Sequence, residues 1–184
     1  KNQGGKTYYL AGGRLARPKH IDLIIRACRE LKVPLKVFGK GFAGYGDELR
    51  VLANGEWRMA NGKKEPLIEF VGEVSDEEKY SLMAGAKAFL FASEDEDFGI
   101  VPLEAMAMGT PVIAYRSGGV KETVVDGKTG LFFDTLTVSS LKDAISRLKA
   151  MKLDPNVLRR HTEQFSKERF KREIDTFVRE SVRS

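Results

Sequence analysis

The sequence predicts an α/β fold in which helices cover both faces of a doubly wound parallel sheet. Short β-rich apolar runs alternate with segments of helical periodicity along almost the whole chain. The runs are continuously apolar, as strands that are buried on both faces must be. The length of 184 residues, with 42% apolar and 31% charged residues, suits one folded domain with a core of its own.

Each element follows from its local pattern. Tyr8–Ala11 is an apolar run, and Pro18–Leu31 then carries apolar residues at helical spacing, with the proline near the first turn, where an N–H is not needed. The later strands are predicted at Leu35–Phe38, Leu67–Val71, Ala88–Ala92, Pro111–Tyr115 and Leu131–Phe133. The helices between and after them are predicted at Asp47–Ala53, Asp76–Ala84, Val101–Met108, Val120–Val125 and Ser139–Met151. The stretch Trp57–Pro66, around Asn61-Gly62, is predicted to be a polar surface connection.

Two further helical segments, Asn156–His161 and Ser166–Val182, follow Pro155. The second is amphipathic, and its apolar face holds Phe170, Ile174, Phe177 and Val178. We expect residues 1–165 to form the main domain and residues 166–184 a C-terminal amphipathic helix. That helix either caps the domain or reaches across to a partner domain.

Composition narrows the class of protein. The single cysteine, Cys28, excludes an internal disulfide framework, and with two histidines a His-based metal cage is not expected. No apolar run approaches the length of a membrane span, and Lys1–Thr7 lacks the apolar stretch of a signal peptide. We therefore expect a cytoplasmic protein, and the absence of an initiator methionine suggests a piece of a longer one.

Positive charge is concentrated near the start of the chain. Residues 1–40 hold ten lysines and arginines against two acidic residues, while the chain as a whole has a net charge of +5. Such a local surplus suits a site for a small anion better than a nucleic-acid face, which needs a broader basic stripe with aromatic residues. We expect no nucleic-acid partner.

In sheets of this class, ligands bind outside the carboxyl ends of the strands, near the point where the strand order reverses. The loop after Ala88–Ala92 leads into a helix that Pro102 marks near its first turn. The N–H groups at this helix start should form a positive pole that accepts anions; they belong to Gly99, Ile100 and Val101.

Two carboxylates flank this pole, Glu96 in the loop and Glu104 about one turn inside the helix. Carboxylates accept hydrogen bonds from hydroxyls, so the layout suits a ligand with an anionic centre and a polyol on each side. A nucleotide sugar is such a ligand. The simpler alternative is that Glu96 is solvated and Glu104 favours the helix start.

A second basic element, 12–19, directly follows the first strand. Two glycines open the turn, and Arg14 and Lys19 then lie five residues apart. The planar guanidinium and the mobile ammonium suit a diphosphate, although two ordinary surface cations would look the same.

The segment 96–114 reads Glu-Asp-Phe-Gly-Ile-Val-Pro-Leu-Glu-Ala-Met-Ala-Met-Gly-Thr-Pro-Val-Ile-Ala, with two glutamates separated by seven residues. Three other motifs accompany it: Gly13-Arg14 with Lys19, Gly118-Gly119-Val120-Lys121-Glu122, and Asp126-Gly127-Lys128-Thr129-Gly130. Together they resemble the C-terminal, donor-binding, Rossmann-like domain of family 4 glycosyltransferases with the GT-B fold. The residues from Glu96 to Glu104 also resemble the O-antigen mannosyltransferase branch of this family.

The resemblance implies a retaining transfer of a hexose, favoured to be mannose, from a nucleotide diphosphate sugar to a glycan or lipid-linked acceptor. Glu96 would contact hydroxyls of the donor sugar, and Glu104 would accept hydrogen bonds from the ribose. Arg14 and Lys19 would stabilise the charge that develops on the diphosphate. The donor-binding backbone would come from Gly13, Gly39, Phe98, Gly99, Ile100 and Val101. The acceptor domain that normally precedes this one is not represented, and with it the full protein could lie peripherally at the inner membrane surface.

The resemblance also puts the loop after Leu67–Val71, with Val74 and Asp76, beside the base. A carboxylate at Asp76 could accept from the two adjacent donors of guanine, whereas uracil presents one donor between two acceptors. GDP-mannose is therefore the favoured donor and a UDP-sugar the alternative, with no separate cofactor. Ser75 or Asp76 could instead be the N-cap of the following helix.

Three other motifs suggest different chemistry. Gly39–Gly44 fits the dinucleotide fingerprint of an NAD-dependent oxidoreductase, but it follows the second strand and no helix is predicted to start at its last glycine. Asp95-Glu96-Asp97 matches a metal-binding Asp-x-Asp, which the cations Arg14 and Lys19 would make unnecessary. His20 could be a base but is expected to be a surface residue. A nucleotide-binding module without transferase activity is the remaining alternative.

Overall fold

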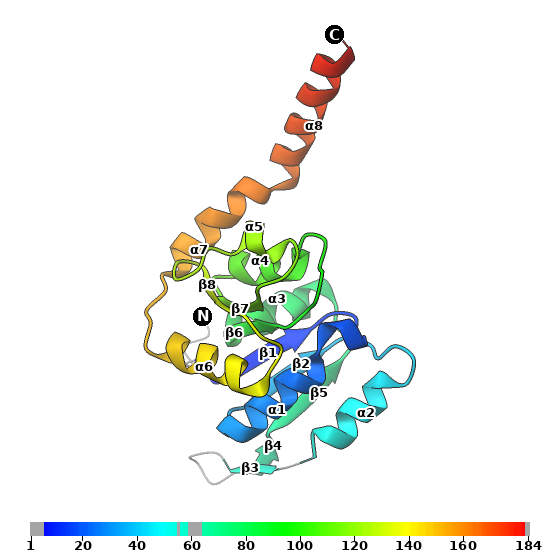
Figure 1. The fold of residues 1–184 in the computed structure, drawn as a ribbon, viewed down its shortest axis with the longest axis vertical. Coiled ribbons are helices and arrows are strands. Elements are labelled where there is room, and N and C mark those ends of the chain that lie inside the picture. Colours follow the sequence, from blue (N-terminus) through cyan, green and yellow to red (C-terminus); the bar gives the residue numbers. More distant parts are fainter. Residues whose placement is uncertain (1–5, 55, 59–63, 183–184) are drawn as a thin grey trace.

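The computed structural model describes residues 6–54, 56–58 and 64–182. At its centre is a six-stranded sheet in the order β5-β2-β1-β6-β7-β8, and every recorded pairing in it is parallel (Figure 1). The strands of this sheet are β1 (Tyr8–Gly12), β2 (Leu35–Phe38), β5 (Ile68–Gly72), β6 (Ala86–Phe91), β7 (Val112–Tyr115) and β8 (Gly130–Phe133). The predicted α/β doubly wound fold is confirmed.

The strand order reverses between β1 and β6. The chain runs outward from β1 through β2 to β5, returns to the other side of β1 as β6, and runs outward again through β7 to β8. The loops that leave β1 and β6 at their carboxyl ends therefore diverge towards opposite faces.

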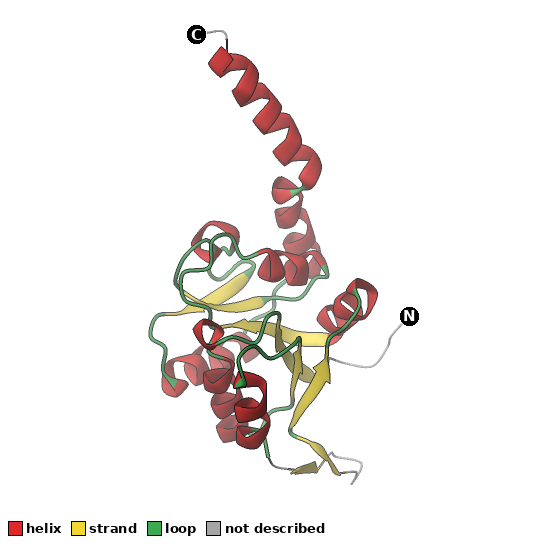
Figure 2. Cartoon of the chain, turned by 90° about the vertical axis from the view of Figure 1, so that its right-hand side faces the viewer, coloured by secondary structure: helices red, strands yellow, loops and turns green. Residues whose placement is uncertain are grey.

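Helices cover both faces of the sheet (Figures 1 and 2). One layer contains α1 (Ile21–Leu31), α2 (Tyr45–Leu52) and α6 (Val138–Lys149). The other contains α3 (Asp76–Gly85), α4 (Ile100–Ala107), α5 (Val120–Thr123) and α7 (Pro155–Thr162).

The central strands show why continuous apolar runs were needed. Tyr9 and Ala11 of β1 pack into the α1 layer, whereas Leu10 between them packs into the α4 layer. Phe89 and Leu90 of β6 divide between the two layers in the same way. Because successive side chains point to opposite faces and both faces are covered, the inner positions of these strands are apolar, and the exception is Lys87, which is exposed near the start of β6.

The first helix differs from its prediction. Pro18 lies in a short 3-10 helix, η1 (Arg17–Lys19), and α1 begins only at Ile21. His20 separates the two with a φ of 45°, in the left-handed region, and donates its N–H to the carbonyl of Arg17. This break lets the chain turn between η1 and α1, so that Lys19 ends η1 in the connection after β1 instead of lying in α1.

Two predictions about the following segments also need correction. Helix α2 begins at Tyr45 and not at Asp47, because Gly44 adopts a φ of 79° and serves as its N-cap. The connection predicted over Trp57–Pro66 contains a short antiparallel pair, β3 (Glu56–Arg58) with β4 (Lys64–Pro66). Asn61-Gly62, the centre of the predicted polar connection, lies outside the described residues.

The C-terminal helix α8 (Lys167–Val182) follows a short 3-10 helix, η2 (Glu163–Phe165), and projects away from the sheet (Figures 1 and 2). Its apolar residues are exposed, with Phe170 at 62% and Phe177 at 67%. Of the two expected roles of this helix, it therefore does not cap the described domain with its apolar face. Among the helices described, none combines the length and apolar character that crossing a membrane requires.

Leu10 tests the two-layer core because it is fully buried at the centre of the sheet. We expect Leu10→Ala to lower the free energy of unfolding by about 2–5 kcal/mol through the lost burial and the cavity left behind. Val51→Ala, at a residue that is 73% exposed, should change it by less than about 0.5 kcal/mol. Urea denaturation of the three proteins measures both values, and equal stabilities would contradict this description of the core.

Candidate functional site

The loops that leave β1 and β6 are joined by charged contacts at the point of strand reversal. The ammonium of Lys19 contacts the Glu96 carboxylate, which also accepts a hydrogen bond from the Ser93 hydroxyl at 3.2 Å. Both side chains of the ion pair are about a quarter exposed, at 27% and 26%. A pair with this exposure is open to a ligand that approaches the carboxyl edge of the sheet.

His20 and Glu94 extend the same junction. The two side chains lie 2.7 Å apart, and the Glu94 N–H donates to the Pro18 carbonyl at 3.0 Å. His20 thus has a structural partner, and at 28% exposure its side chain is half-buried rather than fully at the surface, where it had been expected.

Glycines hold the Glu96 loop by direct backbone contact. The Gly119 N–H donates to the Glu96 carbonyl at 2.7 Å. A Cβ on Gly118 would lie 2.3 Å from that same carbonyl oxygen, and one on Gly119 would lie 2.4 Å from the carbonyl oxygen of Asp97. The two glycines therefore allow a second loop to support the backbone beneath Glu96.

The start of α4 provides an uncompensated positive pole. Gly99 is its N-cap, with a φ of 79°, and no side chain caps the helix. The first turn contains no acidic residue, so the pole that Gly99, Ile100 and Val101 form is not neutralised locally. The ring of Phe98 lies 5.9 Å from that of Phe165, which directs this side chain towards the C-terminal segment and leaves its backbone to the site.

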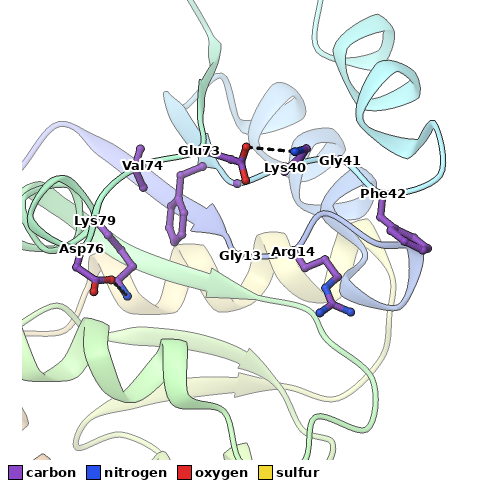
Figure 3. Close-up of a pocket in the computed structure, with 11 residues that line it drawn as sticks. Gly13, Arg14, Lys40, Gly41, Phe42, Glu73, Val74, Asp76 and Lys79 are labelled. Carbon is purple, nitrogen blue, oxygen red and sulfur yellow. Dashed lines mark ion pairs between the residues drawn. The ribbon is translucent and has the colours of Figure 1, made fainter.

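A cavity of about 460 Å³ opens at the carboxyl ends of β1, β2 and β5. It is lined by Gly13, Arg14, Phe38, Gly39, Lys40, Gly41, Phe42, Glu73, Val74, Asp76 and Lys79. Figure 3 shows Arg14 on one side of it and Asp76 with Lys79 on the opposite side. Gly39 has a φ of 114°, and a Cβ there would lie 1.8 Å from the Gly13 carbonyl oxygen, so these two loops are in backbone contact.

Glu104 extends the site from α4 towards α3. One of its carboxylate oxygens, Oε1, accepts from Lys79 at 2.7 Å and lies 3.4 Å from the Tyr80 hydroxyl. Lys79 also contacts Asp76 at 3.0 Å. Burial by itself would lower the pKa of Lys79, but the hydrogen bonds to Glu104 and Asp76 outweigh it and hold the pKa above its usual value. Sequence reasoning missed Lys79, because its spacing from Asp76 is visible in the chain but its contact with α4 is not.

Ser75, and not Asp76, is the N-cap of α3. Ser75 caps α3, and its hydroxyl accepts from the Glu78 N–H while the Glu78 carboxylate accepts from the Ser75 N–H. Asp76 has no part in this capping box and lines the cavity.

The expected site residues thus fall into neighbouring groups. Gly13, Arg14, Gly39, Val74 and Asp76 surround the cavity. Lys19 and Glu96 meet at the strand reversal. Phe98, Ile100 and Glu104 border a second, more apolar cavity of about 630 Å³ beside η2 and the start of α8.

The motif Asp126–Gly130 serves the fold. The Asp126 carboxylate accepts from the Phe132 N–H at 3.2 Å and contacts Arg116 at 3.1 Å. The Thr129 hydroxyl accepts from the Val125 N–H at 2.9 Å. These contacts form the turn that leads into β8, away from the cavity described above.

The structure shows which contacts the loop Gly39–Gly44 and the triplet Asp95–Asp97 make within the fold. Helix α2 does start directly after Gly44, contrary to the expectation, but the glycine loop follows β2 and its Gly39 packs against the loop of β1. In the acidic triplet, Asp95 accepts from the Ser117 hydroxyl at 3.0 Å and Glu96 contacts Lys19. Within the described part of the chain, no three Asp, Glu, His or Cys side chains gather in a metal-binding arrangement.

Gly118 tests the support of the Glu96 loop. Gly118 and Gly127 both have left-handed backbones, with φ of 62° and 73°, but a Cβ on Gly127 would meet no atom within 4 Å. We expect Gly127→Ala to lower the free energy of unfolding by about 1–2 kcal/mol through backbone strain. Gly118→Ala should lower it by about 1–3 kcal/mol more, because the methyl group overlaps the Glu96 carbonyl. Equal losses in chemical denaturation would show that the close packing of the loops is unimportant.

Comparison with known proteins places this geometry in a family. The family model described as glycosyl transferases group 1 matches residues 1–169. The α-1,3/1,6-mannosyltransferase ALG2 of Dictyostelium discoideum is 33% identical over 95% of this chain and 46% of its own length. The GDP-mannose-dependent α-(1-6)-phosphatidylinositol monomannoside mannosyltransferase of Mycolicibacterium smegmatis is 35% identical over 80% of this chain and 40% of its own length.

The solved structure of Anabaena HepE, in complex with UDP and glucose, superposes with a TM-score of 0.71 over 96% of this chain and 48% of HepE, at 23% identity. The chain thus spans less than half the length of the relatives it matches here. It belongs to the glycosyl transferases group 1 family and has the fold of the C-terminal domain of a GT-B glycosyltransferase.

Proposed function

We propose that this chain is the nucleotide-sugar-binding domain of a retaining glycosyltransferase that transfers a hexose, favoured to be mannose, to a glycan or lipid-linked acceptor. The observation that carries the proposal is the layout at the strand reversal. Lys19 contacts Glu96 and Lys79 contacts Glu104, while the uncapped N-terminus of α4 lies between these two glutamates in the chain. A diphosphate between ribose and hexose matches this order of charges.

The cations suit the chemistry of the leaving group. When the bond between the sugar C1 and the β-phosphate oxygen breaks, its electron pair stays on the nucleoside diphosphate. Arg14, Lys19 and the positive pole of α4 would stabilise that growing charge. The acceptor oxygen then bonds to C1 on the face that the leaving group vacates, and its proton passes to the departing β-phosphate oxygen. Lys19 contacts Glu96 in the structure, so a bound diphosphate would share this cation with the carboxylate that recognises the sugar.

Asp76 supports a guanine base. Because Ser75 performs the capping, the Asp76 carboxylate is available at the cavity wall to accept from the two adjacent donors of guanine. The GDP-mannose dependence named for the Mycolicibacterium relative agrees with this choice. The UDP complex of HepE supports the competing UDP-sugar donor.

An acceptor-binding domain would complete the enzyme. The proteins compared above are more than twice as long as the segment that matches this chain, and α8 carries an exposed apolar face. We propose that a preceding domain binds the acceptor and covers α8, in the cytoplasm or at the inner membrane surface. A nucleotide-binding module without transferase activity remains the second candidate, whereas family membership argues against an oxidoreductase.

Calorimetric titration with GDP, UDP, ADP and NADH, each with and without EDTA, tests the donor site. We expect nucleoside diphosphate binding to survive chelation, because Arg14, Lys19 and the α4 pole would neutralise the diphosphate without a metal. A loss of more than about tenfold, or 1.4 kcal/mol, would instead favour a metal at Asp95–Asp97. Failure of every nucleoside diphosphate to bind would refute the proposed function.

Asp76→Asn tests how the base is recognised. If Asp76 accepts from guanine, the variant should lose about 1–3 kcal/mol of binding free energy for GDP and nothing for UDP. Glu77→Gln is the matched control, since it removes the same charge from the neighbouring exposed position of α3. If the unaltered chain binds UDP as tightly as GDP, the guanine assignment fails and mannose loses its main structural support.

A further inference from the structure

Lys79 is the one cation of the cavity lining, as described, that also contacts a carboxylate of α4. Its side chain is 17% exposed and that of Glu104 is 21% exposed, whereas Asp76, its other partner, is 81% exposed. Water screens the contact with Asp76 much more than the contact with Glu104. The link between Lys79 and Glu104 is therefore the stronger one, and it ties α3 to α4.

The contacts on Glu104 are distributed unequally between its two oxygens. Lys79 and Tyr80 both approach Oε1, at 2.7 Å and 3.4 Å. Within the described residues, no hydrogen bond to Oε2 is recorded. An ionised carboxylate can accept about four hydrogen bonds in all, so holding Oε1 fixes the group and leaves Oε2 free to accept from a ligand.

We infer that Lys79 is a positioning residue for ribose recognition, which orients the Glu104 carboxylate so that Oε2 accepts from the ribose hydroxyls of the donor. The inference rests on the proposed function, because it assigns a role within the same nucleotide site. The raised pKa of Lys79 agrees with it, since an ammonium that stays charged keeps the carboxylate fixed.

Two other roles for Lys79 predict different behaviour. As a purely structural link between α3 and α4, it would affect unfolding but not the affinity of the folded protein. As a direct phosphate ligand, it would affect every nucleoside diphosphate equally, whatever its sugar. Positioning through Glu104 requires ribose hydroxyls for any effect on affinity.

The experiment titrates GDP and 2′,3′-dideoxy-GDP into the unaltered chain and into Lys79→Met, Lys79→Arg and Lys40→Met. We expect Lys79→Met to weaken GDP binding about tenfold, the loss of one charge-assisted hydrogen bond, and to leave dideoxy-GDP binding unchanged. Lys79→Arg should restore most of the GDP affinity. Lys40→Met removes a cation of the same cavity that pairs with Glu73 instead, so it should leave the ratio of the two affinities unchanged.

A double-mutant cycle with Glu104→Gln makes the test independent of absolute affinities. Once Glu104→Gln is present, adding Lys79→Met should cause no further loss for GDP, because both changes remove the same interaction. Lys79→Gln, which keeps a polar side chain, carries the same expectations if Lys79→Met does not fold.

Three outcomes would overturn the inference. Equal weakening of GDP and dideoxy-GDP by Lys79→Met would place its effect at the phosphate or, through Asp76, at the base rather than at the ribose, and unchanged GDP affinity would leave it a structural link. In both cases the unaltered chain still binds GDP and the proposed function stands. Absence of GDP binding by the unaltered chain would overturn both.

Discussion

The reversal of strand order between β1 and β6 is the constraint on which the site depends. It makes the loops after these two strands leave the sheet in opposite directions, which leaves a crevice at the carboxyl edge where ligands of such sheets bind. The contact of Lys19 with Glu96 and that of His20 with Glu94 join the two loops there. Because these pairs are partly exposed, they contribute little to stability, and their importance lies in what they hold at the edge of the sheet.

Backbone contact through glycine gives this edge its rigidity. Gly39 touches the loop of β1, and Gly118 and Gly119 touch the loop of β6, each at a distance that excludes a side chain. The loops that carry the charged side chains of the site are therefore held in place by neighbouring backbone. Less conformational freedom of these loops has to be lost when a ligand binds. The two acidic motifs also differ in their contacts: Glu96 lies at the carboxyl edge of the sheet, where Lys19 contacts it, while Asp126 completes a turn.

The sequence was sufficient for the fold and for which loops lie at the carboxyl edge of the sheet, while the roles of the site residues stay predictions. Buried strands are recognisable as continuous apolar runs, and the loops that follow parallel strands meet at the carboxyl edge of the sheet. That reasoning predicted Arg14, Lys19 and Glu96 near this edge, whereas the place of Asp76 was expected from the family resemblance. Features that depend on contacts distant in sequence could not be predicted. The role of Lys79 depends on its contact with Glu104 of α4. His20 separates η1 from α1 through a left-handed backbone that no local sequence pattern requires. The apolar face of α8 looked like a capping face because amphipathicity shows that a helix has an apolar side, not what covers it.

We propose above all that a nucleoside diphosphate binds across the reversal of strand order. Amide hydrogen exchange with and without saturating GDP tests this directly. We expect slower exchange in the loops after β1, β2, β5 and β6 and in the first turn of α4, with unchanged exchange in β8 and α6. Protection confined to α8 or to the α6 face, with residues 13–19 and 96–101 unaffected, would contradict it.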